Sequence, residues 1–552
     1  MIYRTFIIAV LITVSITSCK NPDKALSKSS GTINAVDLEK YISVLASDDF
    51  EGRAPSTEGE KKTINYLAEE FGKLGLEPAN KGSWLQEVSM TKITPGKNMQ
   101  MNITGGKDKL SFNAPGEIIG GSPQTDNTID ISNSEMVFAG YGIIAPEYNW
   151  NDYKGLDVKG KTVVVLVNDP GYATGDTSLF AGKAMTYYGR WTYKFEEAAR
   201  QGAKAVLIIH ETGAAAYPWE VVQNSWVSPH FYLDDNEFLG TSLLFTGWIT
   251  SEAAKKLFSA AGLDFGQIIN NAAQRGFSPV TMPLKASLSF SQTVEHVRSN
   301  NVAALLRGSD KSDEYVIYSA HWDHFGINPE FKGDSVLNGA LDNATGVAAL
   351  LEIAKAFKSL PEKQSRSVLF LAVTAEEQGL LGSKYYVENP IFPLEKTIAD
   401  INMDALNIFG RTRDITIVGF GNSKLDNYAE EVLKNHERYA SPDPTPEKGG
   451  YFRSDHFEFA RKGVPALYFS KGVDNIEHGR EWALAESEKW ISENYHKPSD
   501  NYEPDKWDFN GMIDDIVIFF ETGYELSMTG DFPEWNTGFP FKSLRDNMMK
   551  KN

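Results

Sequence analysis

Short, continuously apolar segments alternate with helically spaced apolar positions through the second half of the chain. Buried strands are predicted at residues 302–306, 314–320, 367–373, 398–403, 414–418 and 466–469. The first two of these strands are expected to pair with each other. Helices are predicted at residues 344–357 and 428–435, where apolar side chains recur on one face. Strands without a polar face need cover on both sides, so the pattern predicts an α/β fold in which helices sandwich a central mixed sheet.

The first half of the chain begins with helical spacing and then changes character. Helices are predicted at residues 35–46 and 56–76, and Thr57 with Glu60 has the spacing of a capping box. Between residues 130 and 290, short strands dominate instead. They are predicted at residues 136–141, 161–167 and 203–210, with a helix at 191–201. This section is therefore interpreted as a β-rich insert in the α/β domain.

The first residues have the pattern of an export signal. Arg4 is positively charged, and the apolar run 6–17 (FIIAVLITVSIT) is shorter than the roughly 20 residues that span a bilayer. Cys19 follows a small residue, which resembles the lipobox of bacterial lipoproteins and implies lipidation of Cys19. We therefore expect an exported protein, anchored by its N-terminal lipid on the periplasmic or cell-surface side of a bacterial membrane. The polar residues 20–32 are predicted to form a flexible tether.

Composition and charge exclude several classes of protein. Of the 552 residues, 41% are hydrophobic and 23% charged, which is typical of a globular protein. The net charge of −19 argues against a nucleic-acid-binding protein, since phosphates are bound by Lys and Arg. Cys19 is the only cysteine, so zinc fingers, iron–sulfur clusters and intrachain disulfides are excluded. Any metal must be held by carboxylates and by some of the nine histidines.

Clusters of metal-binding residue types follow several of the predicted strands. They are His321-Trp322-Asp323-His324, Ala375-Glu376-Glu377, Asn402-Met403-Asp404 and, later, Tyr495-His496-Lys497-Pro498. A further cluster, around Asp342-Asn343, opens a helix. Because ligands of open α/β sheets bind at the carboxyl ends of the strands, these clusters are expected to converge on one edge of the sheet.

The residue types in these clusters suit a pair of divalent cations, with zinc favoured. Two histidines and three or four carboxylates supply enough ligands for two metals, one of the carboxylates bridging them. In an extended segment the side chains of Glu376 and Glu377 diverge, so one can bind metal while the other acts as a base. Asp323 is expected to accept the imidazole N–H of His321 and to orient that ring.

Taken together and in order, these segments resemble the co-catalytic zinc aminopeptidase family, family 28 of metallopeptidase clan MH, over residues 35–530. The resemblance implies two zinc ions. One would be bound by His321 and Asp404, the other by Glu377 and His496. Asp342 would bridge them, followed by a cis peptide bond, and Glu376 would be the general base. No ligand position remains for His324.

Two further features extend the resemblance. Tyr451 and Ser454-Asp455-His456 match a Tyr-x-x-Ser-Asp-His pattern in which the tyrosine polarises the scissile carbonyl, and the three following residues are assigned to the substrate pocket. Relatives have disulfides near this loop, which this chain cannot form. Residues 137–142 and 153–161 are similar to a protease-associated domain, the identity that the resemblance implies for the insert.

The predicted domain boundaries follow from these features. A signal segment (1–19) and a tether (20–32) precede the N-terminal part of the peptidase domain (33–129), the protease-associated insert (130–290) and the catalytic zinc peptidase domain (291–545).

The expected function is that of a lipid-anchored zinc aminopeptidase, which removes N-terminal residues from peptide substrates. Two alternatives stay open. A glutamate-carboxypeptidase-like enzyme of the same fold would bind a substrate carboxylate through arginines, for which Arg453 and Arg480 are candidates. The other alternative is a non-catalytic, receptor-like binding protein, which would have this fold but would not hydrolyse peptides. Glutaminyl-cyclase chemistry is disfavoured by the insert.

Overall fold

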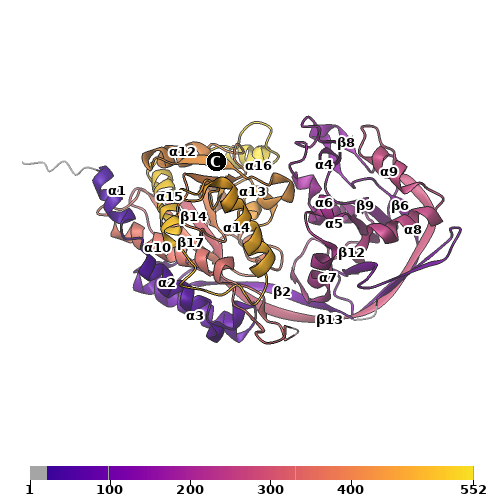
Figure 1. The fold of residues 1–552 in the computed structure, drawn as a ribbon, viewed down its shortest axis with the longest axis horizontal. Coiled ribbons are helices and arrows are strands. Elements are labelled where there is room, and N and C mark those ends of the chain that lie inside the picture. Colours follow the sequence, from indigo (N-terminus) through magenta and orange to yellow (C-terminus); the bar gives the residue numbers. More distant parts are fainter. Residues whose placement is uncertain (1–21, 97–98, 330, 551–552) are drawn as a thin grey trace, which may run out of the picture.

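The chain folds into two lobes, which lie side by side in the computed structural model (Figure 1). The structure describes residues 22–96, 99–329 and 331–550. The long strands β2 (Leu85–Pro95) and β13 (Val280–Leu306) form an antiparallel ribbon that runs from one lobe to the other. Cys19 and the predicted signal segment lie outside the described residues. In the described part of the chain, every helix is too short or too polar to cross a membrane.

The larger lobe is built on a mixed sheet, as predicted. Strands β17, β14, β18 and β21 lie next to one another in this order and run parallel, and β13 and β19 flank them in antiparallel orientation. Every residue of β17 and β18 is buried. Bounds in this sheet are β14 (Lys311–His321), β17 (Arg366–Val373), β18 (Thr397–Met403), β19 (Asp414–Val418), β20 (Tyr439–Pro442) and β21 (Ala466–Ser470).

The predicted pairing of residues 302–306 with 314–320 is wrong. Strand β17 lies between β13 and β14, antiparallel to the first and parallel to the second. Because residues 368–373 of β17 are all apolar, the strand is best buried with a neighbour on each side. This outweighs the short connection between β13 and β14.

Two hydrophobic cores cover the two faces of this sheet. Alternate residues of β17 contribute to each: Phe370 packs in the core with α10, and Leu371 in the core with Tyr386 and Phe459 of the opposite face. The helices of this lobe are α1 (Pro22–Ser30), α2 (Ala35–Leu45), α3 (Glu58–Lys73), α10 (Thr345–Ser359), α11 (Leu381–Glu388), α12 (Leu425–Asn435), α13 (His456–Arg461), α14 (Gly479–Asn494), α15 (Phe509–Met528) and α16 (Lys542–Met549). The helices predicted at 35–46, 56–76, 344–357 and 428–435 are confirmed, and Thr57 caps α3.

The N-terminal tether is largely helical. Residues 22–30 of the predicted flexible segment form α1, and Ser29 and Ser30 are buried. The Ser30 hydroxyl donates a hydrogen bond to Glu521 Oε1 of α15 at 2.6 Å. A polar segment can dock in this way because small hydroxyl side chains fit against a neighbouring helix and find a partner there.

The insert is rich in strands and contains the predicted helix near 191–201, but it has further helices and begins earlier than predicted. Its strands β9, β10 and β12 are parallel, and helices cover them, so the insert is α/β. Strand β3 pairs with β13 and buries Met101 and Ile103 in the core of the insert, which therefore starts near residue 99 instead of 130. A pairing between residues this far apart in the chain leaves no local pattern. The bounds are β3 (Gln100–Thr104), β4 (Leu110–Asn113), β5 (Ile118–Gly121), β6 (Thr128–Phe138), β9 (Thr162–Leu166), α5 (Trp191–Arg200), β10 (Ala205–His210), α7 (Trp219–Val227), β12 (Phe245–Thr250), α8 (Ser251–Ala260) and α9 (Phe265–Ala272).

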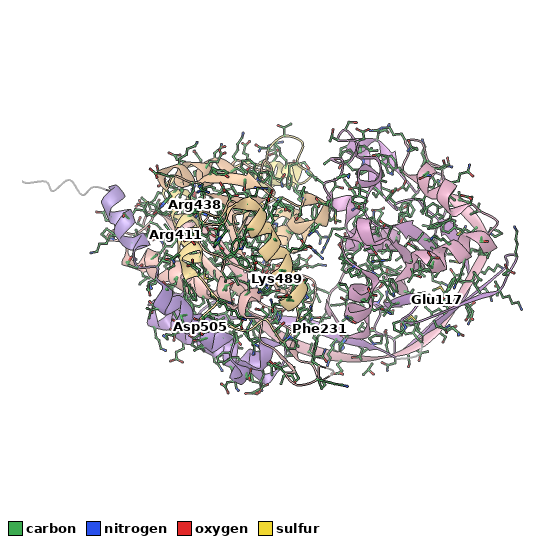
Figure 2. The ribbon with its side chains drawn as sticks, viewed as in Figure 1. Glu117, Phe231, Arg411, Arg438, Lys489 and Asp505 are labelled. Atoms are coloured by element: carbon green, nitrogen blue, oxygen red, sulfur yellow. The ribbon has the colours of Figure 1, made fainter. Side chains whose placement is uncertain are left out.

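The two lobes touch at more than the ribbon. Met185 N of the insert donates to Pro446 O at 3.1 Å, and the ring of Tyr187 lies 5.7 Å from that of Phe457. Nearer the ribbon, Phe231 of β11 (His230–Leu233), labelled in Figure 2, packs against the apolar cluster that includes Leu381. The insert thus rests on the segment 446–457, which includes Tyr451.

Phe370 tests the packing of the central sheet. Its ring is fully buried between Phe71, Tyr318 and Phe357, so Phe370→Ala is expected to lower the free energy of unfolding by about 3–5 kcal/mol. Chemical denaturation followed by circular dichroism measures this. Val36→Ala, at a side chain that is 73% exposed, is the control and is expected to change stability little. Equal effects of the two substitutions would contradict the placement of this core.

Candidate metal centre

The parallel strands deliver the predicted ligands to one edge of the sheet. His321 is the last residue of β14, Glu376 and Glu377 follow β17, and Asp404 follows β18. The parallel pairing of these strands puts their carboxyl ends together, as expected from the strand pattern. Asp342 reaches the same edge from the turn before α10. His496 reaches it just after α14.

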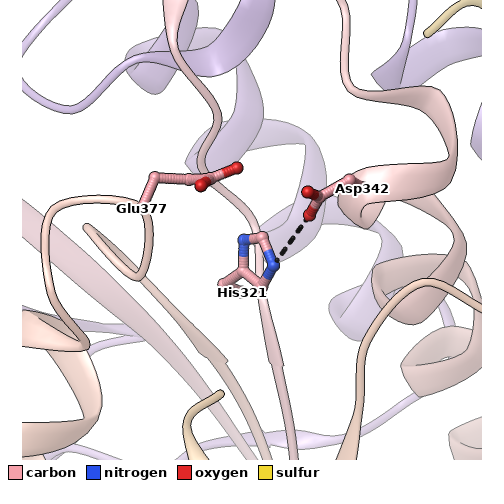
Figure 3. A group of neighbouring side chains, drawn as sticks. All are labelled: His321, Asp342 and Glu377. Atoms are coloured by element: carbon pink, nitrogen blue, oxygen red, sulfur yellow. Dashed lines mark ion pairs between the residues drawn. The ribbon is translucent and has the colours of Figure 1, made fainter. Parts of the chain in front are cut away.

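Asp342 stands between two groups of side chains. Its Oδ1 lies 3.3 Å from Nε2 of His321, and its Oδ2 lies 3.4 Å from Nε2 of His496. On the first side, His321 Nε2 is 3.4 Å from Asp404 Oδ1; on the second, His496 Nε2 is 3.2 Å from Glu377 Oε2. Figure 3 shows His321 facing Asp342, with Glu377 nearby. The two carboxylate oxygens of Asp342 thus face different histidine–acid pairs, which is the arrangement that a bridging ligand requires.

Glu376 lies on the His321 side of this cluster. Its Oε2 is 4.0 Å from Nε2 of His321. Potential ligand atoms of His321, Glu376 and Asp404 lie within 4.8 Å of one another, as do those of His321, Asp342 and Glu377. Glu376 and Glu377 therefore point to different sides, although a turn begins at these residues in place of the predicted extended segment.

The charges of the cluster are strongly unbalanced. The side chains of Asp342, Glu376, Glu377 and Asp404 are at most 14% exposed. Burial, with Glu377 and Asp404 nearby, raises the pKa of Glu376 well above its usual range, although His321 opposes this. Burial lowers the pKa of His496, but Glu377 and Asp342 outweigh it and raise the pKa to about 10.

This donor set fits metal cations. Carboxylate oxygens and imidazole nitrogens converge in a buried place where acidic groups outnumber basic ones, and burying unpaired carboxylates is costly. Histidine and carboxylate are ligands that zinc accepts. His321 and Asp404 could hold one ion and Glu377 and His496 another, with Asp342 between them.

Asp323 supports the centre in a way that differs from the prediction. His321 Nδ1 lies 3.2 Å from the main-chain oxygen of Asp323 but 3.8 Å from its carboxylate. The carboxylate Oδ1 instead accepts a hydrogen bond from the main-chain N–H of Glu376 at 3.1 Å. Asp323 therefore orients the ring through its carbonyl and positions Glu376 through its side chain. Sequence spacing does not distinguish these two oxygens.

Arg53 is a supporting residue that the sequence analysis missed. Its side chain is 1% exposed and donates hydrogen bonds of 2.6–2.8 Å to four main-chain oxygens. These belong to Leu45, Trp322, Asn338 and Gly339, so one guanidinium ties the loop after β14 to the turn that carries Asp342. A single buried arginine leaves no periodic pattern by which the sequence could reveal it.

Two more residues fix the turn that carries Asp342. The carboxylate of Asp500 accepts from the N–H groups of Leu341 and Asp342, at 2.9 and 3.1 Å. The side chain of Asn343 donates to the oxygen of Met403 and accepts from the N–H of Ala405, on either side of Asp404. The peptide bond between Asp342 and Asn343 is cis, as predicted.

His324 has a role that the sequence analysis did not assign. The ring is fully buried, and its Nδ1 lies 2.6 Å from Oε1 of Glu377. His324 is therefore a hydrogen-bond partner of a predicted ligand. Its position three residues after His321 was the only available signal.

The three residues assigned to the substrate pocket are buried in this structure. Ser454, Asp455 and His456 are each at most 1% exposed. Ser454 donates to Asp404 Oδ2 at 2.8 Å, and Asp455 accepts from Ser383 at 2.6 Å. The ring of His456 packs 4.7 Å from that of Tyr468. Their assignment to the pocket stays a prediction.

The structure brings a different tyrosine close to the ligands. The ring of Tyr451 packs against His456 and Phe539, and its buried hydroxyl has no hydrogen-bond partner among the described residues. The ring of Tyr495 stacks on His496 with a centroid distance of 3.7 Å. Burial and the nearby charges of Asp342 and Glu377 raise the pKa of Tyr495. The signal that could have found Tyr495 is its place directly before His496. The role of Tyr451 stays a prediction.

The part of the chain that contains the centre is similar to known proteins. Residues 301–520, which contain all the predicted ligands, match peptidase family M28. Aminopeptidase YwaD of Bacillus subtilis (strain 168) is 25% identical over 225 residues, 41% of this chain and 44% of that protein. A glutamate carboxypeptidase 2 homolog of Caenorhabditis elegans is 21% identical over 421 residues, 68% of this chain and 51% of that protein. The chain thus spans about half or less of these relatives.

A solved structure shows the same fold. The aminopeptidase from Aneurinibacillus sp. strain AM-1 superposes with a TM-score of 0.52 at 19% identity, over 92% of this chain and 97% of that one. The described residues therefore have the mixed α/β fold of that solved structure.

Zinc binding is expected to release protons. Without an ion, the carboxylates keep His496 protonated up to a pH of about 10, and only neutral imidazole binds a metal. Adding zinc to metal-stripped protein near pH ~8 should therefore release at least one proton, measured with an indicator dye. The variant His496→Ala should release fewer. Full zinc binding without proton release would contradict the charge balance described above.

Proposed function

We propose that this protein is a zinc-dependent aminopeptidase with two metal ions per chain. The observation that carries the proposal is the position of Asp342, whose two oxygens face the His321–Asp404 pair and the His496–Glu377 pair. The match of residues 301–520 to peptidase family M28 supports it. The similarity to an aminopeptidase over 41% of the chain supports the finer assignment.

In the proposed mechanism Glu376 moves the proton. Bound zinc supplies Lewis-acid chemistry, lowering the pKa of water and polarising a carbonyl group. Glu376 is not needed as a ligand, lies beside His321, and has a pKa that burial raises well above its usual range. A carboxylate with a raised pKa accepts a proton from water more readily than an ordinary one, and the acid so formed then gives this proton to the leaving amine. The carboxylate of Asp323 accepts a hydrogen bond from the main-chain N–H of Glu376 and so holds Glu376 in place.

Tyr495 is proposed as the phenol that faces the substrate carbonyl. Its ring stacks on His496 and is 42% exposed, so it borders both the ligands and solvent. A phenolic O–H there can donate to the oxygen that gains negative charge. Tyr451 is the alternative named by the sequence, but its hydroxyl is buried, with the side chain of Asn422 nearby.

The location of the protein and the identity of the insert are also proposals. Arg4, the apolar residues 6–17 and Cys19 support a lipid-anchored protein on the outer side of a bacterial membrane. The likeness of residues 137–142 and 153–161 to a protease-associated domain supports that identity for the insert. Metabolic labelling with a fatty acid, lost in Cys19→Ser, tests the anchor.

Glu376→Gln is expected to separate turnover from metal binding. The amide cannot take a proton, so kcat should fall by about 10²–10⁴-fold, while the zinc content stays unchanged because Glu376 is not a ligand. Activity assays with aminoacyl substrates and atomic absorption measure the two quantities. Glu87→Gln, at an exposed side chain of β2, is the matched control. Loss of zinc in Glu376→Gln would show that Glu376 is a metal ligand and that Glu377 is the base.

A carboxypeptidase is the second candidate, and one observation favours it. Arg190 of the insert has a pKa lowered to about 10 by burial and by the charge of Arg453, with Glu376 also close enough to act on it. Its Nε has no hydrogen-bond partner among the described residues. Two guanidinium groups from different lobes near the centre could bind a substrate carboxylate. Arg480, the other candidate, lies at the exposed start of α14.

Blocked peptides decide between the two candidates. An aminopeptidase binds the free α-amine, so N-acetylation of a peptide should abolish its hydrolysis and C-terminal amidation should have little effect. Mass spectrometry of the products shows which end is shortened. The opposite pattern would establish the carboxypeptidase. Zinc-loaded protein that cleaves none of these peptides would support the non-catalytic receptor-like alternative.

A further inference from the structure

A row of buried polar side chains leads away from Asp404 beneath the metal centre. The Ser454 hydroxyl lies 2.8 Å from Asp404 Oδ2, and Asn402 Nδ2 lies 2.7 Å from Ser454 Oγ. On the other side of Asn402, its Oδ1 lies 3.1 Å from Ser319 Oγ, which is also 2.8 Å from Oδ1 of Asp400. Asp400, Asn402 and Ser319 are fully buried, and Ser454 is 1% exposed. We call these four residues the Asp400 row.

The direction of the hydrogen bonds near Asp404 is fixed by its carboxylate. A carboxylate that serves as a metal ligand can only accept, so the single hydroxyl proton of Ser454 points to Asp404. Ser454 Oγ must then accept from Asn402, which can donate only through its amide nitrogen. The amide orientation of Asn402 follows from this network, with its oxygen facing Ser319.

The same reasoning continues to the far end of the row. Ser319 Oγ lies 3.1 Å from Asn402 Oδ1 and 2.8 Å from Asp400 Oδ1, and its hydroxyl has one proton for these two oxygens. With an ionised Asp400, one of the two contacts would have no proton, and its two oxygens would repel each other. A protonated Asp400 that donates to Ser319 leaves the Ser319 proton for Asn402, so that both contacts are hydrogen bonds.

The surroundings of Asp400 agree with a neutral acid. Its other oxygen, Oδ2, is buried and has no hydrogen-bond partner among the described residues. An ionised carboxylate with one partnerless oxygen would be very costly at a fully buried position. Burial raises the pKa of Asp400 well above its usual range and outweighs the hydrogen bond with Ser319, which would lower it; the nearby charge of Asp455 adds to the rise.

We propose that Asp400 is a protonated positioning residue, which donates through Ser319, Asn402 and Ser454 and so holds the carboxylate of Asp404 in its ligand orientation. The inference rests on the proposed metal role of Asp404. In the Asp400 row, the proton of every hydrogen bond points toward the metal centre. The orientation of Asp404 is therefore set by the uncharged carboxyl group of Asp400, four residues earlier in the chain. Asp400 touches neither substrate nor metal.

Two isosteric substitutions with opposite expectations test the direction of the row. Asp400→Asn replaces the acid O–H by an amide N–H, so the donor to Ser319 is kept and zinc affinity should stay within about threefold of wild type. Asn402→Asp puts an oxygen where Ser454 needs a donor, and zinc affinity should fall by about 10–100-fold. Competition with a chromogenic chelator measures both without any peptide substrate. Failure of the peptidase assay would therefore not affect this result.

Infrared spectroscopy tests the proton directly. In metal-stripped protein near neutral pH, the difference between wild type and Asp400→Asn should contain the C=O stretch of a protonated carboxylic acid. Asp414→Asn is the matched control, because the buried carboxylate of Asp414 accepts from two main-chain N–H groups and Ser441. Its difference spectrum should contain ionised-carboxylate bands, and the variant should be less stable than Asp400→Asn.

Several outcomes would overturn the proposal. A loss of zinc affinity in Asp400→Asn as large as that in Asn402→Asp would mean that Asp400 accepts, and so would ionised-carboxylate bands at Asp400. If Asn402→Asp does not fold, judged by its circular dichroism spectrum, Ser454→Ala removes the last donor of the row. Its zinc affinity should then fall by about tenfold. Unchanged affinity in Ser454→Ala would also contradict the proposal.

Discussion

Burying carboxylates at one edge of the central sheet is the constraint on which this structure depends. Asp342, Glu376, Glu377 and Asp404 would repel one another in a place nearly closed to water. Their charge is tolerable only where cations or protons balance it. Positive charge comes from the buried Arg53 and either from protons on the two histidines or from the metal ions that replace those protons. Asp400 avoids adding a further negative charge.

The fold meets this constraint by fixing the backbone around each ligand. Parallel strands β14, β17 and β18 end together, and the guanidinium of Arg53 joins two of the ligand-bearing loops through their carbonyl oxygens. The insert adds support from outside, since Tyr187 packs against Phe457 next to the loop of Tyr451. Apolar contact between lobes thus braces a loop for which this chain has no cysteines to form a disulfide.

The sequence predicted the convergence of His321, Glu376, Glu377 and Asp404 because these residues follow apolar strands, whose ends are local features. Asp342 and His496 lie beside helices instead, and the predicted strand before His496 is replaced by α14. The sequence also predicted the faces of the main helices. It did not predict that β17 separates β13 from β14, or that the insert begins near residue 99, because these pairings join distant parts of the chain. The roles of Arg53, His324 and Ser454 depend on side-chain contacts within the core, and nothing in residue spacing distinguishes them from ordinary buried polar residues. Asp323 shows the same limit. The spacing predicts that its carboxylate orients His321, but its main-chain carbonyl does so, and the carboxylate accepts from the main-chain N–H of Glu376.

The most direct test is to locate the metal ions in crystals of the zinc-loaded protein by anomalous diffraction at the zinc edge. Two peaks should appear, one beside His321 and Asp404 and one beside Glu377 and His496, with Asp342 between them. A single peak, or zinc bound away from Asp342, would contradict a centre in which one buried carboxylate serves two cations.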